Sequence, residues 1–331
     1  MLPFEGGDFR REEAYQMADV RLTTVTRTQG ANAALKSGEV APRGVDLAFE
    51  EIPVLVKGFR RMVRALEFDV CEMALTTYLV AREHGVRFTA LPVFLVRDFH
   101  HGAIMVRPGS GIRTPKDLEG RRVGVNRGYT VTTGVWARAI LHEQYGVDLD
   151  RVIWVRSGDE HVEQYRPPRN VVPLGAGRTL PEALAAGELA AVIGVDAAAA
   201  AEAGFEPLIP DPEQAGYDAL LATGLYPINH LVVVRDELLE QNPGLAADVF
   251  DAFARAKDIY VERLRSNAIE QPDKADRTLR RVMELTGADP LPYGLEPNRA
   301  VLERLVGHAV DQHILARPRP LEELFAPVPT V

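Results

Sequence analysis

The sequence predicts an α/β fold of two lobes with a ligand cleft between them. Strand-like and helix-like segments alternate along the chain, as expected for mostly parallel sheets covered by helices. A strand–turn–helix pattern occurs twice, at 69–78 and at 191–201. Two extended segments that contain histidine, at 97–102 and 226–230, join the two parts. Open sheets bind ligands at the carboxyl ends of their strands, so we expect the site in the cleft.

Four strands and two helices are expected in the first unit. Its strand segments are rich in β-branched residues, alternate in polarity or are strongly apolar. They are Arg21–Thr26, Val45–Ile52, Asp69–Ala74 and Phe88–Val96. Apolar residues at helical spacing predict one helix over about Val54–Glu67, and a second helix begins near Thr76 and stops at Gly85.

The second unit and the C-terminal part are predicted in the same way. The expected strands are Gly102–Val106, Arg122–Val125, Val152–Val155, Ala190–Val195 and His230–Val234. One helix is expected over about Thr132–Tyr145, closed by Gly146. After Arg235 the pattern is helical, with segments at Ala246–Arg265, Ala275–Leu285 and Glu296–His313. We therefore expect a discontinuous first lobe formed by 1–97 and 231–331, and a second lobe formed by 98–230.

Composition argues against several classes of protein. The 331 residues are 46% hydrophobic and carry a net charge of −9 without a Lys/Arg run, which argues against a nucleic-acid surface. Cys71 is the only cysteine, so no intramolecular disulfide can form. No apolar run is long enough to span a bilayer, and the N-terminus has no leader pattern. We expect a cytoplasmic protein with no membrane partner, and a homo-oligomer stays open.

The most informative stretch is 126–133, which follows an apolar strand and ends in hydroxyl residues. Such residues can cap a helix, and the backbone N–H groups at a helix N-terminus form a site for an anion. Simple capping explains the stretch about equally well, but Arg127 and Tyr129 beside the cap favour a ligand site. We therefore take Arg127, Tyr129 and Thr132 as candidate ligand contacts, and Thr76 by the same pattern in the first unit.

Polar residues also mark the two segments that join the units. The first would cross the hinge, where Arg97 can clamp a carboxylate and a histidine can transfer a proton. His230 would lie on the returning segment, so the two histidine-bearing segments would meet behind the ligand. A solvated linker with incidental polar residues explains the first segment equally well.

Sequence patterns for other chemistries are absent. The sequence contains no HExxH, CxxC, Walker-type phosphate loop or GxSxG elbow. His308 and His313 are five residues apart, off a common helical face. Adjacent His100 and His101 would point to opposite sides of an extended chain. We therefore expect no metal site.

Six further segments are distinctive: Phe99–Arg107, Gly111–Gly120, Val123–Val125, Trp136–Arg138, Gly224–Val234 and Tyr293–Arg299. Together they resemble the 4,5-dihydroxyphthalate decarboxylase family, in order, over nearly the whole chain. Gly111–Gly120 is common to many solute-binding relatives, whereas HGAIMVR, YPINHLVV and YGLEPNR are more specific to this family. His100 stands where the family pattern has an arginine, and His101 matches the histidine that follows it.

The resemblance implies a type II periplasmic-binding-protein-like fold. It also implies that a small aromatic substrate, most simply 4,5-dihydroxyphthalate, loses CO2 to give protocatechuate. A para hydroxyl can supply the electrons for this reaction, so no cofactor is expected. Proton transfer would fall to His101 or His230. The residues expected to bind carboxylates are Arg27, Arg97 and Arg127, and those expected to donate hydrogen bonds are Thr76, Tyr129 and Thr132.

Two other functions are compatible with such a fold. A non-catalytic solute-binding protein would have the same cleft, although it would not need the two hinge histidines. The ligand-sensing half of a regulator would have a helix-turn-helix before its first strand, and the sequence shows none. Release of CO2 from hydroxylated phthalates would separate the enzyme from both.

Overall fold

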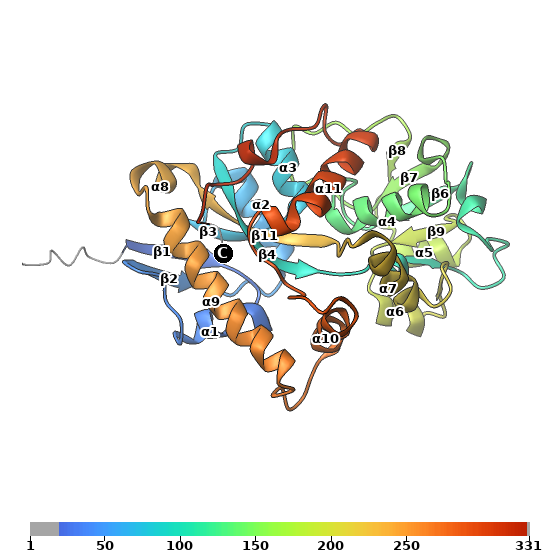
Figure 1. Cartoon of the computed structure of the whole chain (residues 1–331). Coiled ribbons are helices and arrows are strands. Elements are labelled where there is room, and N and C mark those ends of the chain that lie inside the picture. The colour runs from blue at the N-terminus through green and yellow to red at the C-terminus, as the bar shows by residue number, and fades with distance from the viewer. Residues whose placement is uncertain (1–19, 330–331) are drawn as a thin grey trace, which may run out of the picture.

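Two β-sheets form the framework of the molecule. The computed structural model describes residues 20–329 (Figure 1). The first sheet has the strand order β2-β1-β3-β11-β4. Its strands are β1 Val20–Val25, β2 Val45–Phe49, β3 Val70–Ala74, β4 Phe88–Arg97 and β11 Ile228–Arg235. β1 runs parallel to β2 and β3, whereas β11 runs antiparallel to β3 and β4.

β11 completes the first sheet from a distant part of the sequence. It returns from the second sheet and lies between β3 and β4, so that His230 pairs with Ala74 and Ile228 pairs with Arg97. The C-terminal ends of β1, β3 and β4 therefore share one edge with the N-terminal end of β11. This register places His230 at the edge where an open sheet binds its ligand.

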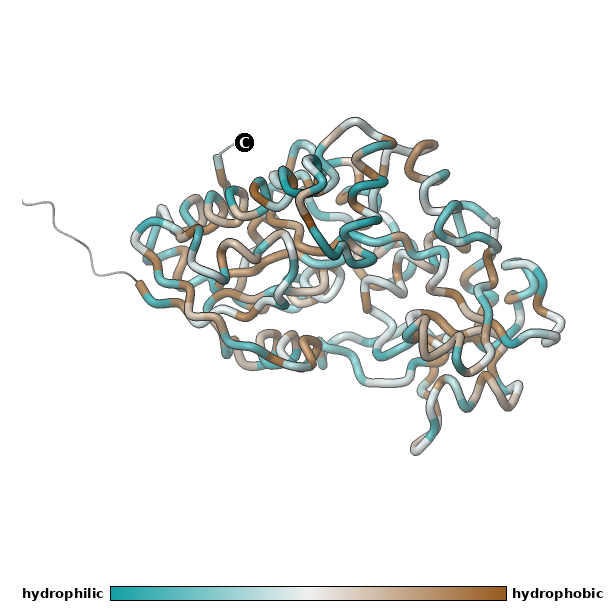
Figure 2. Tube along the Cα trace, turned by 90° about the horizontal axis from the view of Figure 1, so that it is seen from below, coloured by the Kyte–Doolittle hydropathy of each residue, from teal (hydrophilic) through white to brown (hydrophobic). Residues whose placement is uncertain are grey.

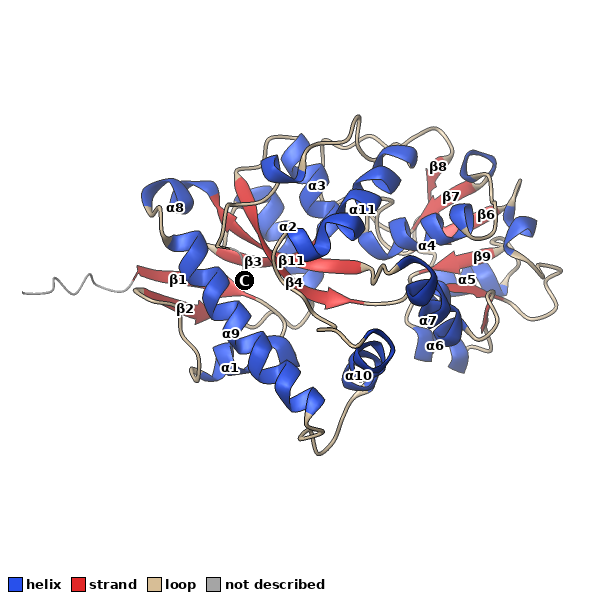
Figure 3. Cartoon of the chain, viewed as in Figure 1, coloured by secondary structure: helices blue, strands red, loops and turns tan. Residues whose placement is uncertain are grey.

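Helices cover both faces of the first sheet. They are α1 Ala33–Ser37, α2 Leu55–Ala65, α3 Leu75–Glu83, α8 Asp236–Gln241 and α9 Leu245–Arg265. α1 and α9 lie on one side of the sheet, and α2 and α3 lie on the other (Figure 3). α2 buries Phe59, Met62 and Val63, which recur at helical spacing.

The second sheet has the strand order β10-β5-β9-β6-β7-β8. Its strands are β5 Ile104–Val106, β6 Arg122–Val125, β7 Ile153–Arg156, β8 Val171–Pro173, β9 Ala191–Ile193 and β10 Glu206–Pro207. The associated helices are α4 Thr132–Glu143, α5 Leu180–Ala185, α6 Ala197–Glu202 and α7 Pro212–Thr223. β6, β7, β8 and β9 are parallel, so the segments that follow β6 and β7 begin at one edge.

Two further helices follow α9 in the C-terminal part, α10 Lys274–Thr286 and α11 Arg299–Asp311. Hydrophobic positions gather along the strands of both sheets, where Val70, Leu91 and Trp154 are fully buried (Figure 2). Among the helices described here, none combines the length and apolar character needed to span a bilayer.

The longer elements confirm the sequence-based predictions to within a few residues. The strand–turn–helix pattern at 191–201 is confirmed by β9 and α6, whereas α1, α5 and α7, and the short strands β8 and β10, were not predicted. β10 has only two residues and both are exposed, so it leaves no apolar pattern. The lobe boundaries stay a prediction, and residues 1–19 and 330–331 of the expected first lobe lie outside the described residues.

Candidate active site

The N-termini of α3 and α4 face each other across the two sheets. The Thr76 hydroxyl donates to the Thr130 carbonyl at 2.5 Å, and it lies 2.9 Å from the Thr132 hydroxyl. Because Thr76 has a single hydroxyl hydrogen, Thr132 donates in the second bond. The Thr76 backbone N–H also donates to Thr132 Oγ1 at 3.1 Å. The two predicted threonines therefore come together, and in this structure they bond to each other.

A histidine–carboxylate pair lies at the edge of the first sheet. His230 Nδ1 is 2.6 Å from Glu72 Oε1, and Glu72 is fully buried on β3. The second oxygen of Glu72 accepts the backbone N–H of Arg27 at 2.8 Å. The carboxylate acceptor fixes the hydrogen of His230 on Nδ1, which leaves Nε2 for a substrate. Arg27, also predicted as a site residue, has an exposed side chain beside this pair.

A second histidine, His161, reaches the same place from the segment after β7. His161 Nδ1 is 2.9 Å from the hydroxyl of Thr77, in the first turn of α3. Its Nε2 is buried and has no hydrogen-bond partner among the residues described. The ring of Phe59 packs edge-on against both histidines, with centroid distances of 5.2 Å to His230 and 6.3 Å to His161.

The charge state of His161 follows from its surroundings. Burial, together with the positive charges of Arg60 and Arg127, lowers the pKa of His161 from 6.5 to about 4. The imidazole is therefore neutral near pH 7. A neutral ring with an unpaired buried nitrogen is suited to hydrogen bonding or proton transfer with a bound ligand.

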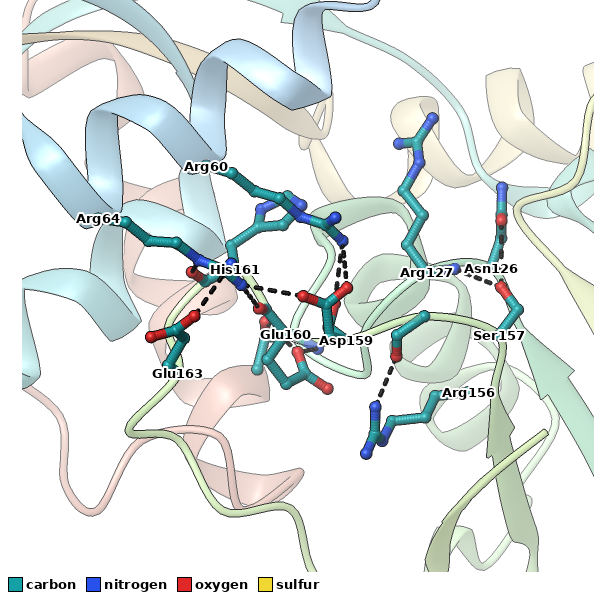
Figure 4. Close-up of polar contacts among 12 residues, drawn as sticks. Arg60, Arg64, Asn126, Arg127, Arg156, Ser157, Asp159, Glu160, His161 and Glu163 are labelled. Carbon is teal, nitrogen blue, oxygen red and sulfur yellow. Dashed lines mark hydrogen bonds and ion pairs between the residues drawn. The ribbon is translucent and has the colours of Figure 1, made fainter. Parts of the chain in front are cut away.

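Arginines lie on both sides of the segment 157–161, on α2 and in the turn after β6 (Figure 4). Arg60 and Arg64 extend from α2 and form ion pairs with Asp159 at 2.7 Å and 2.9 Å. Arg64 also pairs with Glu163 at 3.0 Å. The guanidinium of Arg127 differs, because no carboxylate in the described part of the chain lies within ion-pair distance of it. Burial and the charge of Arg60 lower the pKa of Arg127.

The backbone at Arg127 adopts a conformation that is rare for a residue with a side chain. Its φ is 66°, in the left-handed region. Such strain is found at ligand sites when the surrounding structure fixes it. An unpaired cation on a strained turn is the clearest candidate for binding a substrate carboxylate.

The backbone N–H groups before α4 are already occupied. The Glu160 carboxylate accepts the N–H of Tyr129 at 2.6 Å and the N–H and hydroxyl of Thr130 at 3.2 Å and 2.8 Å. From the sequence we expected a ligand anion at the N-terminus of α4 itself, which begins at Thr132, and this stays a prediction. The ring of Tyr129 is buried, and the guanidinium of Arg138 lies 3.9 Å from its centre. Glu160 therefore occupies only the turn before the helix, and the side chain of Arg127 in the same turn is free to contact a ligand anion.

Two predicted site residues lie outside this cluster. Arg97 is directed to the carbonyls of Tyr226 and Pro292 and to the side chain of Asn298. His101 Nε2 is 2.9 Å from Oε1 of Gln144, which caps the C-terminus of α4. Thr132 is at the other end of this helix, roughly 18 Å away for 12 residues. The hinge segments do meet, because His100 Nε2 is 2.8 Å from the Asn229 side chain.

Several residues of the cluster were not anticipated, and these are Phe59, Arg60, Arg64, Glu72, Asp159, Glu160 and His161. His161 belongs to a polar run that directly follows the strand β7. Its position after a parallel strand could have indicated a site, as it did for Arg127. Glu72 lies inside the apolar strand β3. A single carboxylate in such a strand indicates that it has a polar partner inside the protein.

Surface hollows surround the cluster. One of about 310 Å³ lies between Arg64 and the segment 156–167. Another of about 410 Å³ is lined by Arg27, Arg97 and Tyr260. A third hollow, about 660 Å³, lies at 109–113 and 206–212 and contains no residue of the cluster. Within residues 20–329 there is no group of three His, Cys, Asp or Glu side chains placed to hold a metal ion.

Comparison with known proteins identifies the family. A family model described as the periplasmic substrate-binding protein of a phosphonate ABC transporter matches residues 52–254. A Comamonas testosteroni protein named 4,5-dihydroxyphthalate decarboxylase is 32% identical over 330 residues, which covers 94% of this chain and 98% of the relative. The chain belongs to the 4,5-dihydroxyphthalate decarboxylase family. It also belongs to the wider family of periplasmic substrate-binding proteins that the model describes.

Solved structures share the fold of this decarboxylase family. A putative periplasmic sulfonate-binding protein, SsuA from Methylobacillus flagellatus KT, gives a TM-score of 0.56 at 13% identity. The comparison covers 93% of this chain and 91% of that one. The desulfurization enzyme DSZB gives a TM-score of 0.53 at 17% identity, with 93% and 96% covered. These likenesses confirm the two-lobed, type II periplasmic-binding-protein-like fold.

Proposed function

We propose that the chain is a carboxy-lyase that removes CO2 from a hydroxylated aromatic dicarboxylate, most simply 4,5-dihydroxyphthalate. The observation that carries this proposal is that the His230–Glu72 pair and His161 pack against the same ring of Phe59, while the charge of Arg127 is near enough to lower the pKa of His161. Membership of the decarboxylase family supports the substrate class. A plain binding site would need the cation, but it would not need a histidine held by a buried carboxylate.

The cations orient the substrate. Arg127 binds one carboxylate through its free guanidinium, and the exposed Arg27 is available for the second. Phe59 is fully buried and packs edge-on against both histidines, so it fixes the positions of their rings. These contacts would hold a flat dianion with its ring carbons near the imidazole nitrogens.

Proton transfer starts the reaction. His230, protonated on both nitrogens, donates from Nε2 to the ring carbon that bears the leaving carboxylate. The Glu72 carboxylate stabilises the imidazolium and keeps the ring oriented. The para hydroxyl releases electron density into the ring and its proton passes to the unpaired nitrogen of His161.

Loss of CO2 restores the aromatic ring. The C–C bond to the carboxylate breaks, and its electron pair returns to the ring as CO2 leaves. The phenol recovers its proton from His161, and solvent reprotonates His230. The net change is one proton taken up and one CO2 released, with no redox step.

The test is CO2 release by the purified protein on a small panel. We expect turnover of 4,5-dihydroxyphthalate and none of phthalate, which lacks the electron-donating hydroxyls. We also expect activity to survive dialysis against a strong chelator. Tight, reversible binding of the hydroxylated compound without any CO2 would instead make the chain a solute-binding protein.

We further propose that the protein works in the cytoplasm. The lone buried Cys71 requires no oxidising compartment, although it does not exclude one. Fractionation of cells that express the native gene tests this location. Recovery of the protein with periplasmic markers would contradict it.

A further inference from the structure

We infer that Glu160 is a positioning residue. Its carboxylate occupies the anion nest, which we define as the backbone N–H groups of Tyr129 and Thr130 before α4. It thereby holds both Arg127 and His161 in place for the substrate. This inference rests on the proposed function, because it assigns those two residues to the substrate. Glu160 itself need not touch the ligand.

The carboxylate of Glu160 lies among hydrogen-bond donors of the turn before α4. Both oxygens of Glu160 accept hydrogen bonds, from the backbone N–H groups of Tyr129 and Thr130 and from the Thr130 hydroxyl. Every partner is a donor, which is the pattern of an ionised carboxylate. Glu160 is buried, so these bonds replace the water that the charge has lost.

Glu160 also packs against the turn that carries Arg127. A Cβ atom added to Gly128 would lie 2.3 Å from Glu160 Oε2, so the carboxylate sits directly against the backbone there. The preceding residue, Arg127, has the left-handed φ of 66°. Its N–H donates to Ser157 Oγ, and its carbonyl accepts the N–H of Gly158. The segment 157–160 therefore supplies the hydrogen-bond partners of the Arg127 backbone and of the next two N–H groups that are bound, while Arg138 and Gly194 hold the two ends of the turn.

His161 directly follows Glu160 in the chain. When the Glu160 carboxylate accepts its hydrogen bonds, the backbone at residue 160 is fixed. The side chain of His161 is then directed toward Thr77 and Phe59. One side chain thus sets the separation between the cation that binds substrate and the histidine that exchanges a proton. An error of about 1 Å in such a placement can lower the rate about 100-fold.

Acetate rescue of Glu160→Ala tests this role. The substitution removes the atoms of an acetate ion and leaves the nest empty. We expect kcat/KM to fall about 100-fold while the far-UV circular dichroism is unchanged. Added acetate should raise kcat/KM of the variant at least tenfold. Acetamide, which has the same shape but no charge, should not raise it. Wild type in the same acetate solutions corrects for competition with the substrate.

Asp117 provides a matched control. Its carboxylate also accepts two backbone N–H groups, of Arg113 and Thr114, and the Thr114 hydroxyl. It lies in an exposed turn that contributes no residue to the cluster. Asp117→Ala should keep kcat/KM within about twofold of wild type, and acetate should not change it.

Amide hydrogen exchange at Tyr129 and Thr130 gives a readout that does not depend on activity. Both amides should lose protection in Glu160→Ala and recover it with acetate. Recovery of protection without recovery of kcat/KM would overturn the positioning role and leave Glu160 as a stabilising residue. A loss of less than twofold in kcat/KM would overturn it as well.

Failure of the proposed function would have a different signature. In that case wild type releases no CO2 from any hydroxylated phthalate, whatever happens at Glu160. The nest is then judged by exchange alone: acetate-dependent protection supports the carboxylate's hold on the turn, and its absence overturns it.

Discussion

At the scale of single residues, His230 is the side chain whose environment most resembles that of a general acid. Its Nδ1 is held by a fully buried carboxylate, while its Nε2 is left for a ligand. His101 also lies at a hinge segment, but its Nε2 bonds to Gln144 on the exposed side of α4. The two histidines therefore make distinguishable predictions.

Replacing His230 by Asn should lower kcat by about 10²- to 10⁴-fold, the usual contribution of general acid catalysis. KM should change much less, because the arginines that bind the carboxylates remain. Steady-state CO2 release measures both values. His101→Asn is the control, and a loss of this size in that variant alone would return the catalytic role to His101.

Arg127→Ala should weaken substrate binding without weakening the fold. Losing one charge-assisted hydrogen bond costs about 1.5–3 kcal/mol, so KM should rise roughly 10- to 100-fold. The urea midpoint should stay near that of wild type, because the guanidinium has no acidic partner to lose within the described residues. Arg122→Ala, an exposed position on β6, the strand that precedes Arg127, is the control. Unchanged KM and kcat would remove Arg127 from the site.

The depressed pKa of His161 makes stability depend on pH. The unfolded chain takes up a proton near pH 6.5, but the folded chain does so only near pH 4. Between these values the unfolded state binds more protons, so stability falls as the pH drops from about 6.5 to 4. The loss from this residue is roughly 3 kcal/mol across the window. Urea unfolding at pH 4.5 and 7.5 should show a smaller pH difference for His161→Gln, and an equal difference would contradict the assignment.

At the scale of elements, the N-termini of α3 and α4 form a buried polar contact between the two sheets. Thr132 accepts the Thr76 N–H and donates to the Thr76 hydroxyl, with both side chains buried. The contact joins an element of the first sheet to one of the second. These hydrogen bonds therefore stabilise the folded molecule only when its two halves lie together.

Thr132→Val should reveal the strength of this contact. Valine keeps the shape but leaves the Thr76 N–H buried without an acceptor, which costs about 1–3 kcal/mol. Chemical denaturation measures this loss. Thr133→Val, one residue along the same helix, should stay within about 0.5 kcal/mol because its hydroxyl makes no hydrogen bond with the described residues. Equal effects at the two positions would show that the cross-helix bonds contribute nothing specific.

At the scale of the whole molecule, ion pairs connect α2 to the segment after β7. Asp159 accepts Arg60 and Arg64 together, but its side chain is 58% exposed, so each pair contributes little. We expect these ion pairs to stabilise the closed arrangement of the two halves and to add little to the free energy of unfolding. Salt should screen them.

Asp159→Asn should raise KM about 2- to 5-fold with little change in kcat, in line with the modest energy of exposed pairs. Wild type in about 0.5 M salt should move toward the same value. Glu188→Gln, which breaks the Arg178 pair within the second half, should leave KM unchanged. A KM that is insensitive to Asp159 would mean that these pairs form only incidentally.

Sequence reasoning reached the fold more completely than the site. Strands such as β4 and β11 are continuous apolar runs, so their positions follow from local pattern. His161 depends instead on where α2 and Thr77 lie, and no local pattern encodes that meeting. Arg97 was predicted to bind a carboxylate because it is a charged residue beside the hinge. Its guanidinium instead donates to backbone carbonyls far along the chain, at Tyr226 and Pro292.

The insertion of β11 between β3 and β4 also constrains the order in which the molecule can be made. When residues 20–97 have left the ribosome, the first sheet still lacks the strand that separates its last two members. The strands of the second sheet, from Ile104 to Pro207, are contiguous in the chain and can pair first. Until Ile228–Arg235 is synthesised, β3 and β4 have open edges that invite pairing with other chains. His230 arrives with that same strand, so a chain truncated before it has neither a finished sheet nor the proposed acid.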